Sequence, residues 1–190
     1  MKQINVTLNS THALLMNNNQ GVNPAHPLTK ALKEVTGKRK KTDDDTDKIL
    51  ELKWKLALYH KDGIGPYIPA ANIEATIREA AKRSKRGKDV VMGIRVEPEH
   101  EPLMYDGPRD IDGLYADIDH RDVRVGRIQR ASVTLSRPRF DHWKVQFSLD
   151  YDEDIFSDNE IQELLATAGK YIGLCDYRPR YGTFEPIISN

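Results

Sequence analysis

The sequence predicts an α+β protein in which a largely antiparallel sheet carries helices on one face. Apolar and polar residues alternate in segments near both ends of the chain, as they do in strands with one buried face. Elsewhere, apolar residues recur at helical spacing behind recognisable capping residues. With 38% apolar side chains in 190 residues, the chain can bury a core of its own.

Strands are expected wherever this alternation is sustained. It is clearest in Ile4, Val6 and Leu8, and in "WKVQFSLDY" at residues 143–151. The predicted strands are 2–9, 90–96, 123–136, 143–151 and 180–188, all in one sheet. We expect 123–136 to form one long or bent strand that pairs with 143–151.

Two helices are expected to pack together on that sheet. The range 69–86 has Pro69 in its first turn and Gly87 placed to end it. The range 157–169 opens with a Ser-x-x-Glu capping box. The residues expected to be buried in their shared core are Trp143, Phe147, Ile73, Ile77, Ile161 and Leu165.

Two insertions, at about 17–62 and 97–119, interrupt this pattern. The first carries an inserted helix at about 43–59, where Thr42 can act as the cap and aspartates complement the helix dipole. The second is rich in Pro, Gly and acids without periodicity, so we expect a long loop. Without the insertions the order is strand, helix, strand, strand, helix, strand, which is the split βαβ arrangement of ferredoxin-like folds. We therefore expect a single domain over residues 1–190.

Composition limits the function classes. Twenty-nine basic residues balance twenty-nine acidic ones, so any affinity for nucleic acid must come from local patches of charge. Cys175 is the only cysteine, which excludes an internal disulfide framework and thiolate zinc sites and favours a reducing compartment. The chain has no signal-peptide pattern and no long apolar run. We expect a cytoplasmic protein with no membrane contact.

The segment "YRPRYGTF", residues 177–184, resembles the earlier "SRPRFDHW". In the later copy Arg178 and Arg180 can contact phosphates, while Tyr181 and Phe184 offer rings for base stacking. Gly173 and Gly182 would let the backbone approach a ligand closely. The alternative is that the arginines are solvated and that Tyr181 or Phe184 lies in the core.

Further basic residues join this pattern. Arg127 and Arg130 belong to a series of arginines that clusters with Arg137 and Arg139, and basic residues crowd the end of the helix at 69–86. Ordinary surface solvation and complementation of the helix dipole are the alternatives. The candidate nucleic-acid-binding residues are Arg178, Arg180, Tyr181, Gly182, Arg137, Arg139, Arg127, Arg130, Lys82 and Arg83.

The segments "YIPAANIEATIREAAKR" and "GKYIGLCDYRPRYGTFEP" resemble two parts of the RAMP superfamily, the RNA-binding subunits of CRISPR effector complexes. The first is similar to the segment that opens the first helix of those proteins, and the second to their glycine-rich loop before the last strand. The resemblance implies a noncatalytic subunit that holds single-stranded RNA and assembles with copies of itself. The Arg-Pro-Arg-aromatic ending also resembles that of uncharacterised bacteriophage proteins.

Two alternatives remain beside a noncatalytic protein that binds single-stranded RNA or DNA. One is a phage interaction protein that inhibits a host defence complex, or a virion component, which would present its acidic loop and basic helix to a protein partner. The other is a metal-dependent nuclease. Its ligands would come from "YADIDHRD", which holds the hard-oxygen donors and imidazole Asp117, Asp119, His120 and Asp122. No motif with the spacing of a catalytic or cofactor site occurs, so we expect no catalysis, metal or cofactor.

Overall fold

The structure is a computed structural model that describes residues 1–128 and 131–189, together with their side chains except at 127, 128, 131 and 132. It is an α+β structure whose strands form antiparallel pairs. The chain divides into two compact units. Unit 1 comprises Met1–Leu14, Lys61–Asp106 and Asp141–Asn190, and unit 2 comprises Leu15–His60 and Gly107–Phe140.

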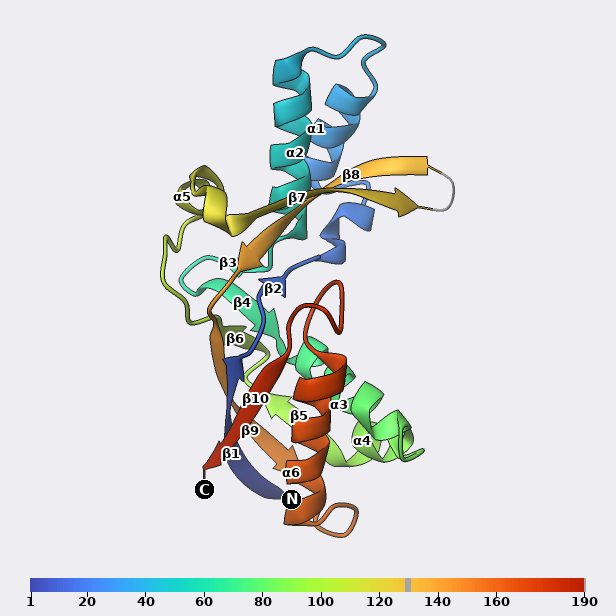
Figure 1. Cartoon of the computed structure of the whole chain (residues 1–190), viewed down its shortest axis with the longest axis vertical. Helices are drawn as coiled ribbons and strands as arrows, with labels where there is room; N and C mark the ends of the chain where they lie inside the picture. The colour runs from blue at the N-terminus through green and yellow to red at the C-terminus, as the bar shows by residue number, and fades with distance from the viewer. Residues whose placement is uncertain (129–130, 190) are drawn as a thin grey trace. The chain divides into compact units, whose positions relative to one another are not determined.

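Unit 1 is built on a four-stranded sheet in the order β10-β1-β9-β5 (Figure 1). The strands are β1 (Lys2–Ser10), β5 (Ile94–Glu97), β9 (Lys144–Tyr151) and β10 (Phe184–Ser189). Every neighbouring pair is antiparallel, so β1 and β5 run in the same direction with β9 between them. Val6 at the centre pairs with Phe147 on one side and Ile188 on the other.

Helices cover one face of this sheet (Figure 1). They are α3 (Ala70–Lys82), α4 (Gly87–Gly93) and α6 (Asp158–Thr167), and a π-helical turn, η3 (Ala168–Ile172), continues α6. α3 contacts both α6 and β5, and α6 contacts β10. The residues expected in the shared core are all buried: Trp143, Phe147, Ile73, Ile77, Ile161 and Leu165.

β4 (Gly65–Pro69) and β6 (His100–Pro102) of unit 1 belong to a small sheet in the order β3-β4-β6, and the boundary between the units falls within β3 (His60–Lys61). Glu101 pairs with Ile68 in this sheet and is 1% exposed. Its Oε1 accepts no hydrogen bond from the described residues, and burial raises the pKa of the carboxyl from 4.5 to about 7. This environment therefore favours the protonated form of Glu101 up to a pH of about 7.

Unit 2 combines helices with a second three-stranded sheet, in the order β2-β8-β7. Its elements are β2 (Leu14–Leu15), η1 (Asn19–Val22), α1 (Pro27–Thr36), α2 (Asp43–Ala57), α5 (Ile111–Ala116), η2 (Ile118–His120), β7 (Arg121–Ile128) and β8 (Ala131–Phe140). α2 packs on β8, and the indole of Trp54 donates to the His120 carbonyl at 2.9 Å. The Lys53 ammonium donates to the Thr134 carbonyl at 2.7 Å.

Capping predictions were correct at two helices and wrong at one. Thr42 and Asp45 form a capping box at α2, and Ser157 and Glu160 form one at α6. α3 instead ends at Lys82, the turn after it holds Lys85 in the left-handed region at φ 63°, and Gly87 begins α4. The predicted strand at 90–96 consequently starts only at Ile94.

The expected strand at 123–136 is wrong in both form and partner. β7 and β8 are two strands that pair with each other, and β9 pairs with β1 and β5 instead. Alternation marks a half-buried strand but carries no information about which strand lies beside it. The range 97–119 is also no simple loop, because it holds β6, α5 and most of η2.

Candidate nucleic-acid interface

The C-terminal loop, residues 173–183, connects η3 to β10, and backbone hydrogen bonds at Gly173, Leu174 and Gly182 close its base, which we call the neck. The Leu174 amide donates to the Gly182 carbonyl at 2.8 Å, and the Gly182 amide donates to the Ala13 carbonyl at 2.7 Å. The Gly173 amide donates to the Ala168 carbonyl at 2.9 Å. These bonds fix both ends of the loop on the rest of unit 1.

The two glycines of the neck serve the fold. Gly173 and Gly182 have φ values of 80° and 72°, a region that favours glycine. A Cβ on Gly182 would lie 2.1 Å from the Leu174 carbonyl oxygen, so no larger residue fits. Gly182 therefore does not make the predicted contact with a ligand in this conformation. Its amide is already bonded to the Ala13 carbonyl of the chain itself.

The tip of the loop is exposed and combines charge with aromatic rings. Arg178 and Arg180 are both exposed. Tyr177 is 50% exposed and stacks on Tyr181, with ring centroids 5.5 Å apart and planes 20° from parallel. The expectation that Phe184 offers a stacking face is wrong, since it is buried and packs edge-on against Trp143.

Arg178 links the loop to α3. Its Nη1 donates to the Thr76 hydroxyl and to the Gly173 carbonyl, both at 3.4 Å. The Thr76 hydroxyl itself lies 3.1 Å from the Gly173 carbonyl, so the neck is seated on the middle of α3. Bonds as long as those of Arg178 are weak, which leaves its guanidinium available to a stronger acceptor.

The C-terminal end of α3 adds further cations. The Arg83 guanidinium lies 4.9 Å from the ring centroid of Tyr171, and the Lys170 ammonium lies 5.2 Å from the same centroid. Lys82 is exposed and pairs with Glu79. That contact, assisted by the charges of Arg78 and Arg178, lowers the pKa of Glu79.

Together these side chains form a surface that we call the loop–helix face. It consists of Tyr177, Arg178, Arg180 and Tyr181 from the loop, Lys82 and Arg83 from α3, and Lys170 and Tyr171 from η3. Thr76 and Arg83 lie about 10 Å apart along one side of α3, because each helical residue rises about 1.5 Å. Arg178 thus contacts the middle of α3, and its charge acts on Glu79, the ion-pair partner of the predicted residue Lys82.

Sequence reasoning missed part of this face. Tyr177, Lys170 and Tyr171 were not among the candidates. Their signal was present in "GKYIG", where a cation and a ring directly follow a glycine, and in the spacing of Tyr177 and Tyr181. Arg86, in contrast, is a basic residue of this region that does not belong to the face.

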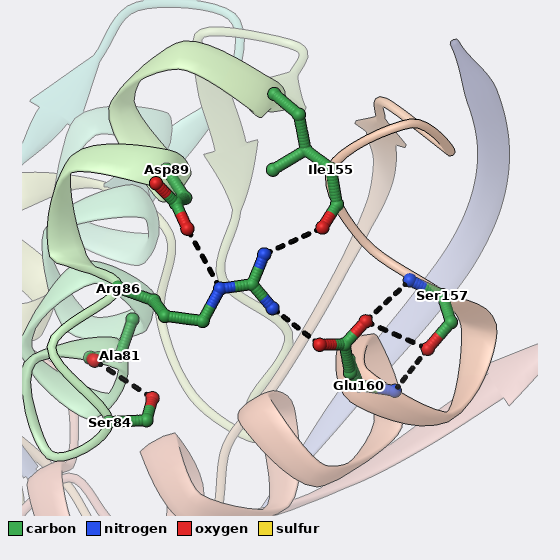
Figure 2. A network of polar contacts seen from close by, with 7 residues as sticks. All are labelled: Ala81, Ser84, Arg86, Asp89, Ile155, Ser157 and Glu160. Atoms are coloured by element: carbon green, nitrogen blue, oxygen red, sulfur yellow. Dashed lines mark hydrogen bonds and ion pairs between the residues drawn. The ribbon is translucent and has the colours of Figure 1, made fainter.

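Figure 2 shows how Arg86 is used within unit 1. Its Nε donates to Asp89 at 2.8 Å, its Nη2 donates to the Ile155 carbonyl at 2.6 Å, and its Nη1 pairs with Glu160. The guanidinium also lies 4.5 Å from the ring centroid of Phe156. Arg86 therefore joins the start of α4 to the start of α6.

The predicted residues of unit 2 occupy different surroundings. Arg137 is 7% exposed, and its Nη2 pairs with Asp122 at 3.0 Å, so it does not offer the phosphate contact predicted for it. Arg139 is half-buried. Arg130 and the side chain of Arg127 lie outside the described residues.

The acidic segment proposed for a metal is used locally. Asp117 accepts from the Asp119 amide at 3.0 Å and caps η2, and Asp122 is held by Arg124 and Arg137. His120 Nδ1 lies 2.9 Å from the Arg139 carbonyl. Within residues 1–128 and 131–189, no group of three His, Cys, Asp or Glu side chains could hold a metal ion.

Charge is divided unequally between the units. Unit 1 holds 13 Lys and Arg against 18 Asp and Glu, while unit 2 holds 16 against 11. The cations of the loop–helix face are therefore a local concentration on a unit with a net negative charge. Any attraction that this face exerts on an anion depends on short-range contacts.

No protein-family model matches this sequence, and no curated protein matches it either. In the part of the chain that the structure describes, no helix has the length and apolarity needed to cross a membrane. Function must therefore be inferred from the chemistry of the loop–helix face.

Proposed function

We propose that the protein is a noncatalytic binder of single-stranded nucleic acid and that the loop–helix face is its contact surface. The observation that carries this proposal is the position of Arg178. Its guanidinium contacts Thr76 of α3 and acts on Glu79, the ion-pair partner of Lys82. In the sequence it stands between the exposed Tyr177 and the half-buried Tyr181. A surface that binds a single strand combines cations, which contact the phosphates, with aromatic rings, on which the bases stack.

Each component has a distinct role. Arg178 and Arg180 contact phosphates through forked hydrogen bonds, and Arg83 adds a third cation at the end of α3. The stacked pair of Tyr177 and Tyr181 presents a ring to an unpaired base. Such stacking requires bases that are free of a duplex, so a single strand is favoured over double-stranded RNA or DNA.

The architecture of unit 1 supports a finer proposal about the fold. Its elements follow the order strand, helix, strand, strand, helix, strand, and the sheet order β10-β1-β9-β5 places the last strand beside the first. We infer a ferredoxin-like, RAMP-like domain in which unit 2 is built from two insertions, 15–60 and 107–140. RNA as the preferred ligand, self-assembly and a phage origin rest on the resemblances described above. We place the activity in the cytoplasm, which would be that of the bacterial host.

The test uses purified protein and labelled single strands. We expect copurifying RNA that raises the absorbance ratio and is removed by nuclease, and saturable binding of a single-stranded RNA by the stripped protein. The double variant Arg178→Ala with Arg180→Ala should bind at least tenfold more weakly. Arg95→Ala is the matched control, because Arg95 is an exposed arginine of β5 in the same unit.

Two results would refute the proposal. One is a stripped protein that binds neither RNA nor single-stranded DNA at low salt. The other is a double variant that binds as tightly as the parent while remaining folded.

A further inference from the structure

A second surface of unit 1 lies on α3 and α4 and differs from the loop–helix face in its chemistry. Val91 and Met92 of α4 are 60% and 67% exposed, which is unusual for two adjacent aliphatic side chains. They line a hollow of about 850 Å³ together with Arg78, Lys82, Lys85 and Lys88. We call this surface the aliphatic–cationic hollow.

The hollow is held in shape by the turn between the two helices. Gly87 allows α4 to begin close to α3, since a Cβ there would lie 3.1 Å from the Lys82 side chain. Arg86 then fixes α4 by its bonds to Asp89, Ile155 and Glu160 (Figure 2). The backbone around the hollow therefore needs little ordering when a ligand arrives, which favours binding.

The hollow and the loop–helix face share Lys82 at their border and otherwise use different sides of α3. Thr76 and Arg83 are seven residues apart and share one side, whereas Arg78 and Lys82 are neighbours at i, i+4 on another. The loop–helix face combines cations with aromatic rings. The hollow combines cations with aliphatic groups only, and it offers no ring on which a base could stack.

These features identify the kind of occupant. Four cations around the hollow call for an anionic partner, and the exposed Val91 and Met92 call for an apolar side chain between its negative charges. Met adapts its shape to such side chains. A concave surface accepts an inserted side chain, whereas a membrane is bound by apolar groups that project from the surface.

From this complementarity we propose that the aliphatic–cationic hollow docks an acidic amphipathic segment of another protein, in which carboxylates flank apolar side chains. This proposal is independent of nucleic-acid binding. A nucleic acid, an anionic membrane and a second copy of this chain are competing occupants. The second copy would offer Ile118, which is exposed between Asp117 and Asp119.

The probe is a labelled synthetic peptide of repeated Glu-Glu-Leu-Leu units, measured by fluorescence anisotropy. We expect saturable binding with a Kd of about 10–100 μM, and binding at least tenfold weaker for Glu-Glu-Ser-Ser and Lys-Lys-Leu-Leu peptides of equal length. The double variant Val91→Ser with Met92→Ser should lose the binding by tenfold or more. Ile187→Ser is the control, because Ile187 is an exposed apolar residue of β10 outside the hollow.

Several outcomes would overturn the proposal. Equal binding of the Glu-Glu-Leu-Leu and Glu-Glu-Ser-Ser peptides would mean attraction by charge alone. No loss of peptide binding in the double variant would place the contact elsewhere. Concentration-dependent self-association that the same variant abolishes would assign the hollow to a second copy, and vesicle binding that it abolishes would assign the hollow to a membrane.

Single-stranded RNA keeps this test separate from the test of nucleic-acid binding. We expect the Val91→Ser, Met92→Ser variant to bind RNA as the parent does, and Arg178→Ala with Arg180→Ala to bind the peptide as the parent does. Loss of RNA binding in the first variant would instead make the hollow part of the nucleic-acid surface.

Discussion

Arg137 and Arg178 each open an Arg-Pro-Arg-aromatic segment, and the two segments have opposite surroundings. In β8, Arg137 is buried against Asp122, and Phe140 is 1% exposed and packs against His120. In the C-terminal loop, Arg178 is exposed with two long hydrogen bonds, and Tyr181 is half-buried against Tyr177. One segment belongs to the interior of unit 2 and the other to a surface of unit 1.

The difference lies in the partners that the fold supplies. Asp122 pairs with Arg137 across the β7–β8 ladder. The ion pair offsets part of the desolvation energy of burying the arginine. Arg178 has no carboxylate within ion-pair distance among the described residues and stays in solvent. The same contrast holds for Phe140 and Tyr181. A phenylalanine carries no polar group and can be fully buried, whereas a tyrosine hydroxyl needs water or a hydrogen-bond partner.

The largest effect is expected for Arg137→Ala. Removing this guanidinium leaves Asp122 buried with Arg124 as its remaining ion-pair partner. The free energy of unfolding should fall by at most about 3–5 kcal/mol, the loss for a buried charge left without a partner. Arg178→Ala should change it by less than about 1 kcal/mol. Denaturant titration of both variants measures this contrast, and equal losses would erase the distinction between the segments. Adding Asp122→Ala to Arg137→Ala should recover part of the loss.

The aromatic residues of the two segments, Phe140 and Tyr181, should also differ in their contribution to stability, with the larger contribution again from the segment in β8. Phe140→Ala is expected to lower the free energy of unfolding by about 3–5 kcal/mol, because a ring in a packed core leaves a cavity. Tyr181→Ala should cost clearly less. Thermal unfolding of the two variants provides the measurement, and a greater loss for Tyr181→Ala would show that its ring is a core residue.

Glu101 sharpens the comparison, because it is a buried carboxyl without the partner that Asp122 has. Burial raises the pKa of Glu101 to about 7 in the folded state, so folding takes up a proton and stability falls as pH rises from about 4.5 to 7. The loss should reach at most about 3 kcal/mol. Glu101→Gln should remove this dependence in denaturant titrations at pH 5 and pH 8. Glu99→Gln, at an exposed neighbour, should retain it.

The smallest of these effects concerns binding. Tyr177→Ala or Tyr181→Ala should weaken single-stranded RNA binding by about 1–3 kcal/mol if a base stacks on the pair. Tyr181→Phe keeps the ring and should bind as the parent does. Fluorescence anisotropy gives these affinities, and equal weakening by Tyr181→Phe would mean that the hydroxyl, and not stacking, makes the contact.

Local signals in the sequence identified much of unit 1. The Thr42 cap located α2, the Ser157–Glu160 capping box located α6, and alternation located β1 and β9, because each depends on residues that are close in the chain. Pairing in the sheet depends on distant residues. The sequence pattern therefore predicts one strand where β7 and β8 pair with each other, and it does not predict α1 or α4.

The site was predictable in the same partial way. The exposure of Arg178 and Arg180 was predictable, because Pro179 and Gly182 beside them are turn-forming residues that the sequence shows directly. The burial of Arg137 could not be predicted, since it depends on Asp122 lying opposite in a hairpin whose pairing was not expected. The stacking of Tyr177 on Tyr181 depends on backbone angles such as the φ of 56° at Tyr177, which a sequence pattern does not specify.

The most direct test of nucleic-acid binding by the C-terminal loop is the salt dependence of affinity for a single-stranded RNA. Each phosphate contact contributes about 0.7 to the slope of log K against log salt concentration, so losing Arg178 and Arg180 together should reduce the slope by about 1.4. Arg95→Ala should leave the slope unchanged. A double variant with the parent's slope and affinity would contradict the assignment of this loop to nucleic-acid binding.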